Sequence, residues 1–305
     1  MIPCPLALTI IVPALNEEAA IGSTLDELRL HFPDSEILVI DDGSTDHTAA
    51  KAAAVSGVRI VRHDMNRGYG AAIKTGVRQA GNEVVAWYDA DGQHTPQTLR
   101  LLVERFTRNE LHAAIGARTR GSAIEGRRIL AKAVLGFFVQ LVAGRRLADV
   151  NCGLRVVRRS VLRRYLHLLP DGFSASITSM LLLLKRGYRV EFVPIVTRSR
   201  TGTSTVRMLR DGLLAIQTSL RILILFQAFH AFTVVATLLF VVGSTYGTGM
   251  ALLFGRGFPA LASVLVLSGV VIFFMGLLTD QVVALRMERL EENVLEDRMP
   301  GAGVS

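Results

Sequence analysis

The 305-residue chain is poor in cysteine and aromatic residues, with only two cysteines and one tryptophan. Cys4 and Cys152 are too few for a disulfide framework, and they fit a reducing compartment. The chain also lacks zinc-ligand spacing, a helix-turn-helix signal and an aromatic RNA-binding pattern. Its formal net charge of +8 therefore predicts contact with an anionic membrane surface and anionic substrates, and no nucleic-acid partner.

The start of the chain lacks two common motifs. No basic leader or small-residue cleavage pattern accompanies its apolar residues, so we expect residues 6–12 to form a strand and not a signal peptide. No G-x-G-x-x-G follows that strand, which disfavours a dinucleotide-dependent oxidoreductase. We find no internal repeat.

Charge is absent from long stretches near the C-terminus. Within residues 222–242 the only strongly polar side chains are Gln227 and His230, and residues 258–279 carry no charge. Each stretch exceeds the ~18 residues that suggest a membrane span, and at about 1.5 Å per residue each can cross a ~30 Å hydrocarbon core. A buried helix of a soluble domain is the competing interpretation, and two such stretches joined by a short Gly-rich link disfavour it.

Basic residues flank the two apolar stretches on their outer sides. They are Arg207, Arg210, Arg221, Arg286 and Arg289. Only Arg256 lies in the link, so the positive-inside rule places both ends of the hairpin in the cytoplasm. We expect a cytoplasmic domain at 1–205, an interfacial amphipathic helix at 206–220, two transmembrane helices within 221–285 (about 222–244 and 258–280), and a cytoplasmic tail at 286–305.

Short β-branched runs alternate with helix-like segments in the first part of the chain. The predicted strands are 7–12, 36–40, 58–62, 84–88 and 112–116, and the predicted helices are 17–31, 47–55, 69–80 and 96–107. This alternation predicts an α/β fold with a mostly parallel sheet. Asp46 and Thr95 are expected N-caps. A basic helical region at 118–150 and a last strand at 189–196 follow.

Acidic residues follow the predicted strands. Asp89 and Asp91 end an apolar run, and side chains at i and i+2 of an extended or turning backbone can point to the same side. Such a pair can hold Mg²⁺ or Mn²⁺ in a half-open oxygen site, although a solvated acidic turn is the alternative. Glu17, Asp41 and Asp42 are expected at the same sheet edge, where ligands of parallel sheets bind.

These segments together resemble a known family. The first four motifs are V-P-A-L-N-E-E (12–18), D-D-G-S-T-D (41–46), N-R-G-Y-G-A-A-I-K (66–74) and D-A-D-G-Q-H (89–94). They resemble family 2 glycosyltransferases, which have the Rossmann-like GT-A fold. Three later segments resemble the branch that uses polyprenyl phosphates, such as dolichyl-phosphate mannosyltransferase: N-C-G-L-R (151–155), L-L-P-D-G-F-S (168–174) and R-S-R-T-G-T-S (198–204).

The resemblance implies a function. We expect an inverting, metal-dependent transferase that moves a hexose, mannose or glucose, from a GDP- or UDP-sugar to a polyprenyl monophosphate. The reaction would take place at the cytoplasmic face of the membrane with Mg²⁺ or Mn²⁺ bound. Two alternatives stay open, namely transfer to a hydroxyl of a lipid-linked glycan and a catalytically silent membrane-binding module. Assembly into a homo-oligomer is also open.

The resemblance and the pattern of charges assign candidate site residues. Asp91, Asp149 and Arg118 form the catalytic set, and Asp89, Asp91 and the amide oxygen of Gln93 form the metal set. The nucleotide-sugar set is Pro13, Leu15, Glu17, Asp41, Asp42, Asp89, Ala90, Asp91, Arg118 and Arg200. The acceptor-phosphate set is Arg127, Arg128, Lys132 and Arg198. The alternative interpretation of the arginines is that they only contact the charged membrane surface. The alternative for Asp41 or Asp42 is a turn that caps a helix.

Two positions need separate mention. Asp149 stands where the family has the carboxylate nearest the attacking group. It would serve as a general base for a hydroxyl acceptor, but a phosphate oxygen is already anionic and needs only orientation. Thr205 stands where relatives have a lysine, which leaves the donor-phosphate contact of that loop to another residue such as Arg207.

Overall fold

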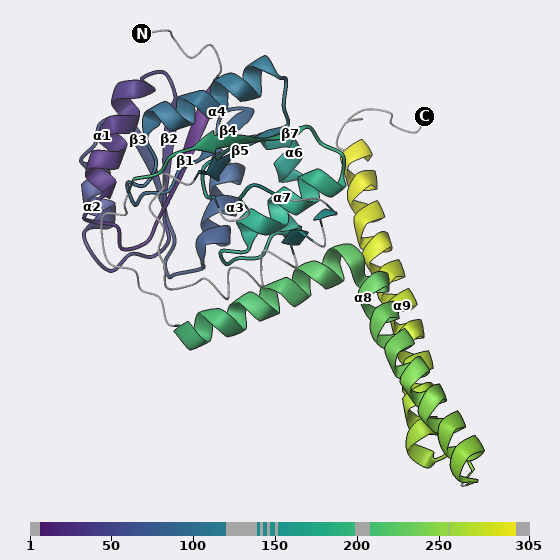
Figure 1. Ribbon diagram of the computed structural model, residues 1–305. Coiled ribbons are helices and arrows are strands. Elements are labelled where there is room, and N and C mark those ends of the chain that lie inside the picture. The colour runs from purple at the N-terminus through teal and green to yellow at the C-terminus, as the bar shows by residue number, and fades with distance from the viewer. Residues whose placement is uncertain are drawn as a thin grey trace, which may run out of the picture. The chain divides into compact units, whose positions relative to one another are not determined.

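The computed structural model describes residues 7–119, 139–140, 143–144, 147–149, 152–198, 208–255 and 257–296. The chain divides into two compact units, Met1–Leu213 and Leu214–Ser305. The first unit contains a sheet flanked by helices, and the second consists of long helical segments (Figure 1).

The sheet of the first unit has seven strands in the order β3-β2-β1-β4-β6-β5-β7. The strands are β1 (Leu8–Ala14), β2 (Glu36–Asp41), β3 (Val58–Arg62), β4 (Val84–Trp87), β5 (Ala113–Arg118), β6 (Arg155–Arg158) and β7 (Val190–Ile195). All pairings are parallel except those of β6, which lies antiparallel between β4 and β5. The predicted, mostly parallel α/β fold is confirmed.

Helices cover both faces of this sheet. They are α1 (Ile21–His31), α2 (Thr48–Ala53), α3 (Tyr69–Gln79), α4 (Pro96–Arg108), α6 (Arg159–Arg163), the 3₁₀ helix Leu166–Leu168 and α7 (Ala175–Lys185). Every residue of β1 and β4 is buried, as expected for parallel strands that are covered on both sides. Alternate residues of β1 supply the two cores: Ile10 packs with α1 and α4, and Ile11 with α3, α6 and α7.

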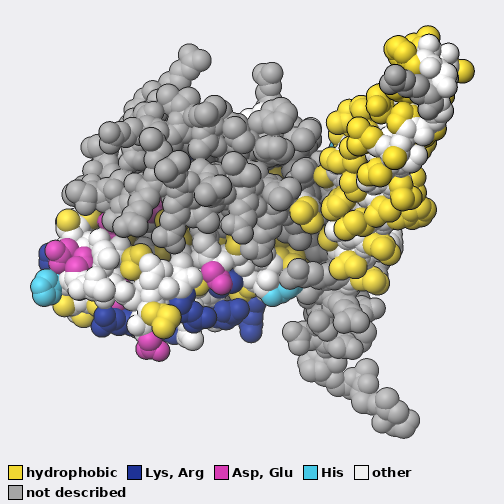
Figure 2. Space-filling model, turned by 90° about the horizontal axis from the view of Figure 1, so that it is seen from below, with side chains coloured by type: hydrophobic (Ala, Val, Ile, Leu, Met, Phe, Trp, Pro, Cys, Tyr) yellow, Lys and Arg dark blue, Asp and Glu magenta, His cyan; other side chains and the backbone are white. Residues whose placement is uncertain are grey.

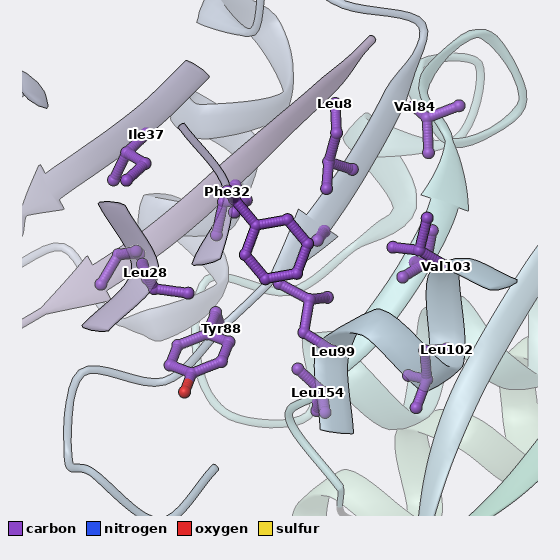
Figure 3. Packing of buried hydrophobic residues seen from close by; sticks show 14 of the residues in the cluster. Leu8, Leu28, Phe32, Ile37, Val84, Tyr88, Leu99, Leu102, Val103 and Leu154 are labelled. Atoms are coloured by element: carbon purple, nitrogen blue, oxygen red, sulfur yellow. The ribbon is translucent and has the colours of Figure 1, made fainter. Parts of the chain in front are cut away.

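The core beneath α1 and α4 follows from helical spacing. α1 buries Leu25 and Leu28, and α4 buries Leu99 and Leu102, at the three- to four-residue intervals that define one helix face. Figure 3 shows Leu28, Leu99 and Leu102 with Phe32 around the sheet. Each such buried side chain contributes about 1.5–3 kcal/mol relative to an exposed one.

Some boundaries differ from the sequence prediction for local reasons. α1 begins at Ile21 and not at residue 17, and the turn before it is closed by hydrogen bonds from the amides of Ala20 and Ile21 to the Glu17 carbonyl (3.1 and 2.9 Å). The Thr95 cap is confirmed, since its side chain accepts from the Thr98 amide. Asp46 lies one residue before the N-cap position of α2, where its carboxylate accepts from the Thr48 amide at 2.9 Å. Most of the basic region predicted as helix, 120–138, lies outside the described residues.

The second unit contains most of α8 (Met208–Phe254) and all of α9 (Ala260–Glu296). Backbone torsions at Gln227 are not helical (φ −147°, ψ 41°), so α8 changes direction there. Two segments, Phe226–Phe254 and Ala260–Leu285, are long and apolar enough to cross a membrane. The first helix continues to Phe254, beyond the predicted end at 244, so the link between the helices is shorter than the sequence suggested.

Glycines allow α8 and α9 to pack closely. A Cβ atom at Gly276 would lie 2.6 Å from Cβ of Phe232, and one at Gly243 would lie 2.8 Å from Cβ of Leu265. Small residues at a helix–helix contact are typical of membrane hairpins, where van der Waals packing drives association. Hydrophobic side chains cover the outer surface of this helix pair (Figure 2). The two helices are therefore suited to form the predicted transmembrane hairpin.

Candidate active site

The parallel strands β2, β1 and β4 are neighbours and end at the same sheet edge. Ala14 pairs with Asp41, and Ile11 pairs with Trp87. The acidic residues that follow β2 and β4 therefore lie at that edge, as the sequence predicted.

Asp89 follows β4 and is enclosed by protein groups. The Tyr69 hydroxyl donates to Asp89 Oδ1 at 3.0 Å, and His94 Nε2 lies 3.7 Å from Oδ2. On a third side the carboxylate touches the backbone, since a Cβ atom at Gly153 would be 2.0 Å from Oδ2. Burial raises the pKa of Asp89, but the nearby His94 imidazole, the Tyr69 hydroxyl and the Arg155 charge together hold it below its usual value. The carboxylate is therefore anionic at neutral pH.

Asp91 and Gln93 share a tight turn after Asp89. The Gln93 amide donates to Asp91 Oδ1 at 3.1 Å, and Gly92 between them has a positive φ of 72°. Both side chains are half-buried. The Gln93 carbonyl accepts from the Arg198 amide at 2.9 Å, so the chain leaving β7 fixes this turn from outside.

His94 was missed as a candidate, although it ends the D-A-D-G-Q-H motif. Its side chain is 4% exposed, and its Nδ1 has no hydrogen-bond partner. The Tyr88 hydroxyl donates to the His94 carbonyl at 2.6 Å and holds the backbone in place. The motif itself was the available signal, since a histidine this close to paired carboxylates can orient them.

Asp42 is committed to the protein backbone. Its oxygens accept from the amides of Arg67 (3.0 Å) and Gly68 (2.7 Å) and contact His63 Nδ1 (2.6 Å). These contacts fix the loop that leads into α3. Asp42 is 3% exposed, and its carboxylate is occupied by these contacts with the loop and with His63. Its nucleotide contact stays a prediction.

Asp41 is also fully buried, but it makes fewer contacts. Oδ1 accepts from the Ser44 amide at 3.0 Å, while Arg62 Nε lies 3.1 Å from Oδ2. Asp41 is thus held within the protein at the end of β2 by a backbone amide and an arginine, and its contact with a ribose or a base stays a prediction.

The loop after β1 joins the loop after β2. The Asn16 amide donates to Ser44 Oγ at 3.0 Å, and the Glu17 amide donates to Thr48 Oγ1 at 2.8 Å. Pro13 lies within β1, and Leu15 directly after it is 37% exposed. These candidates of the nucleotide-sugar set therefore lie beside Asp41 at the sheet edge.

Arg118 and Asp149, both in the catalytic set, contact each other directly. Arg118 Nε and Nη2 donate to the two oxygens of Asp149 at 2.7 and 3.1 Å, and the Arg118 amide donates to Oδ2 at 3.2 Å. This hydrogen-bonded pair raises the pKa of Arg118 above its usual value. Because a guanidinium engages both of its oxygens, Asp149 is better suited to orient a neighbour than to abstract a proton.

Arg155 is a buried cation that the sequence prediction missed. It is 1% exposed on β6, and its guanidinium lies 5.3 Å from the centre of the Trp87 ring. It donates to the Cys152 carbonyl at 3.1 Å and to Ser179 Oγ at 3.2 Å, which joins β6 to α7. Burial lowers its pKa, while the same burial raises the pKa of the Cys152 thiol to about 12. The thiol is therefore protonated and inert.

The remaining basic candidates divide into two groups. Arg127, Arg128, Lys132 and Arg200 lie outside the described residues. Arg198 is described, and its Nη1 lies 3.4 Å from Glu27 Oε1 on α1. The contact of Arg198 with an acceptor phosphate stays a prediction.

The oxygen atoms after β4 fit a divalent cation of the predicted type. Within the described residues no group of three or more His, Cys, Asp or Glu side chains is arranged to hold a metal ion. Asp89 and Asp91 with the Gln93 amide instead offer a partial set of hard oxygen ligands on one turn. Mg²⁺ and Mn²⁺ are suited to such a set, because they retain water and take substrate phosphates as further ligands.

Comparison with known proteins identifies the family of this chain. Residues 9–166, just over half of the chain, match Glycosyl transferase family 2. The chain therefore belongs to family 2 of the glycosyltransferases, and the fold is GT-A, as the motifs predicted. Glycosyl transfer is the activity of this family.

The sequence identity to individual proteins is low. An uncharacterized protein of Methanocaldococcus jannaschii, MJ1222, is 33% identical over 196 residues, which are 62% of this chain and 80% of that protein. The undecaprenyl-phosphate mannosyltransferase of Micrococcus luteus is 28% identical over 67% of this chain and 93% of its own length. The crystal structure of glucosyl-3-phosphoglycerate synthase from Mycobacterium tuberculosis with Mn²⁺, UDP and phosphoglyceric acid has a TM-score of 0.60 at 21% identity, covering 72% of this chain and 78% of that one.

Proposed function

We propose that this protein transfers a hexose from a GDP- or UDP-sugar to a polyprenyl monophosphate, with inversion at the anomeric carbon and with Mg²⁺ or Mn²⁺ bound. Mannose and glucose are the sugars we expect. The catalytic unit would face the cytoplasm, where nucleotide sugars are made. The observation that carries the proposal is the oriented, anionic Asp89 beside Asp91 and Gln93 at the carboxyl end of β4.

The residues at this sheet edge would bind different parts of the substrates. Asp89, Asp91 and Gln93 would hold the cation, which supplies charge neutralisation to the departing nucleoside diphosphate. Asp41, Pro13, Leu15 and Glu17 would bind the nucleoside. Because a phosphate acceptor carries its own negative charge, attack on the sugar requires no general base. Asp149 would instead hold the Arg118 guanidinium toward substrate oxygens.

The two apolar helices support a lipid acceptor. A polyprenyl phosphate remains in the bilayer, and a catalytic unit tethered to the same membrane meets it at a raised effective concentration. Phe226–Phe254 and Ala260–Leu285 supply such a tether. The likeness to an undecaprenyl-phosphate mannosyltransferase supports the same acceptor class.

The test is a transfer assay with full-length protein in detergent. Radiolabelled GDP-mannose, UDP-glucose and UDP-GlcNAc are each supplied with undecaprenyl or dolichyl phosphate, and label is measured in the organic extract. We expect transfer from one of the first two donors, loss of transfer with EDTA, restoration by Mn²⁺, and a β-linked product by NMR. The matched control is Asp34→Asn, an exposed acid before β2, which should transfer like the wild type.

Two results would contradict the proposal. The first is absence of transfer to either lipid phosphate from any of the donors. The second is transfer that requires a hydroxyl acceptor and is lost with Asp149→Asn while the phosphate acceptor remains inactive, which would favour the lipid-linked glycan alternative.

A further inference from the structure

The loop at residues 169–174, between the 3₁₀ helix and α7, is docked onto the start of α3. The Ala71 amide donates to the Asp171 carbonyl at 3.1 Å, and Lys74 Nζ donates to the Leu169 carbonyl at 3.2 Å and pairs with the Asp171 carboxylate. Glycine at position 70 makes the approach possible, because a Cβ atom there would lie 2.1 Å from the Pro170 carbonyl oxygen. The loop therefore has a defined position.

This docking presents one aromatic side chain to solvent. Phe173 in the loop is 82% exposed, yet its ring stacks on Tyr69 with centroids 5.3 Å apart and an interplanar angle of 17°. The Tyr69 hydroxyl donates to Asp89 Oδ1 at 3.0 Å. An exposed phenylalanine ring is thus connected through one side chain to the carboxylate at the centre of the candidate site.

Tyr69 is fixed at two points, by the stack of its ring on Phe173 and by the hydrogen bond from its hydroxyl to Asp89. Its ring cannot rotate away without losing the stack on Phe173. The hydroxyl therefore holds Asp89 in one orientation.

We propose that the outer face of the Phe173 ring forms one wall of the donor-sugar subsite, and that Tyr69 is a positioning residue for Asp89 beneath it. This inference rests on the proposed function. A hexose presents an apolar C–H face that can stack on an aromatic ring, and the cation that Asp89 would hold places the donor diphosphate, and with it the sugar, beside that ring.

Other ligand parts fit this combination less well. An isoprenoid chain has no group that binds the cation. The nucleoside candidate Asp41 ends β2 and Leu15 follows β1, whereas Asp89 follows β4. The sugar is the part of the donor that lies next to the diphosphate and its cation, and so next to Asp89.

The experiment measures binding of donor and product separately. Full-length protein in detergent with Mn²⁺ is titrated calorimetrically with a nucleotide sugar and with its nucleoside diphosphate, using the pairs GDP-mannose and GDP or UDP-glucose and UDP. We expect Phe173→Ala to weaken nucleotide-sugar binding about tenfold, because stacking contacts are worth up to about 1.5 kcal/mol, and to change nucleoside diphosphate binding less than twofold. Phe173→Tyr should retain binding.

A second variant tests the positioning role. Tyr69→Phe keeps the stacked ring and removes the hydroxyl. We expect it to raise several-fold the Mn²⁺ concentration required for half-maximal nucleoside diphosphate binding, and to lower kcat more than it raises KM for the donor. A purely structural role for Tyr69 would lower the thermal unfolding temperature without moving the metal requirement.

The control is Leu30→Ala on α1, an apolar side chain that is 67% exposed and should bind every ligand like the wild type. The inference is overturned if Phe173→Ala weakens sugar nucleotide and nucleoside diphosphate equally, weakens neither, or instead loses binding to phosphatidylglycerol vesicles. If the wild type binds no nucleotide sugar at all, the proposed function itself fails.

Discussion

Two pairs of acids at the same sheet edge are used differently. Asp41 at the end of β2 and Asp42 directly after it are both buried, and Asp42 contacts two backbone amides and an imidazole. Asp89 and Asp91 after β4 are partly exposed, and Asp89 is oriented mainly by side chains. Both pairs follow apolar strands, so their position alone does not distinguish them.

The two pairs differ in the groups that neutralise their negative charge. Backbone amides donate hydrogen bonds to Asp42, and these bonds fix the loop before α3. The acids after β4 can instead bind a cation. A buried acid that is satisfied by backbone amides supports the fold, and a partly exposed acid held by side chains is available for a ligand. Variants at each pair should therefore affect different properties.

The largest effect is expected at Asp91. Asp91→Asn should reduce sugar transfer by at least about a hundredfold, the scale seen when one electrostatic contact to a developing charge is removed. Its free energy of unfolding should change by less than about 0.5 kcal/mol, as for substitutions of partly exposed side chains. The transfer assay and urea denaturation measure the two quantities. If Asp91→Asn retained full, metal-stimulated sugar transfer, the proposed difference between the two pairs of acids would be wrong.

Asp42→Asn should have the reverse effect, with stability as the main loss. The asparagine amide group cannot accept the backbone amide that an Asp42 oxygen now accepts, and a buried unsatisfied donor costs about 1–3 kcal/mol. We expect a destabilisation of about 2 kcal/mol in urea denaturation. An unchanged denaturation midpoint would show that the loop before α3 does not depend on this acid.

The smallest effect concerns an acid at the opposite end of β2. Glu36 accepts from Thr9 Oγ1 (2.6 Å), the Gly81 amide (2.7 Å) and Arg59 (2.9 Å), and these bonds outweigh burial and lower its pKa below 4.5. Its contribution to stability is present above pH 4.5 and is lost as pH falls through the lowered pKa.

Glu36→Gln should accordingly cost about 1 kcal/mol at pH 7 and progressively less below pH 4.5. Denaturation midpoints of the wild type and the variant, measured from pH 7 to about pH 3, would show this convergence. A constant difference across that range would contradict it.

The sequence predicted the elements that depend on local patterns. The strands from β1 to β5 and β7 were found because continuous apolar runs end at polar residues, and the membrane helices because they lack charge. Strand β6 was missed, because R-V-V-R is short and begins with Arg155, which is buried only through contacts with Trp87 and α7. A four-residue sequence cannot show that its arginine will contact a tryptophan and a helix from distant parts of the chain.

The same reasoning explains which site residues were found. Acids after strands could be predicted, because parallel strands must end together. Tyr69 and Phe173 were not, because their relation depends on the 169–174 loop meeting α3, which no periodicity encodes. The pairing of Arg118 with Asp149 also joins distant segments, so each residue was chosen without its partner.

Gly153 restricts which residues can evolve beside Asp89. Any side chain there would occupy the space of the Asp89 carboxylate, since even a methyl group would come within 2.0 Å of it. A larger residue at 153 would force the Asp89 carboxylate out of its present contacts with Tyr69 and His94, so a chain that carries one should have lost the orientation of this acid.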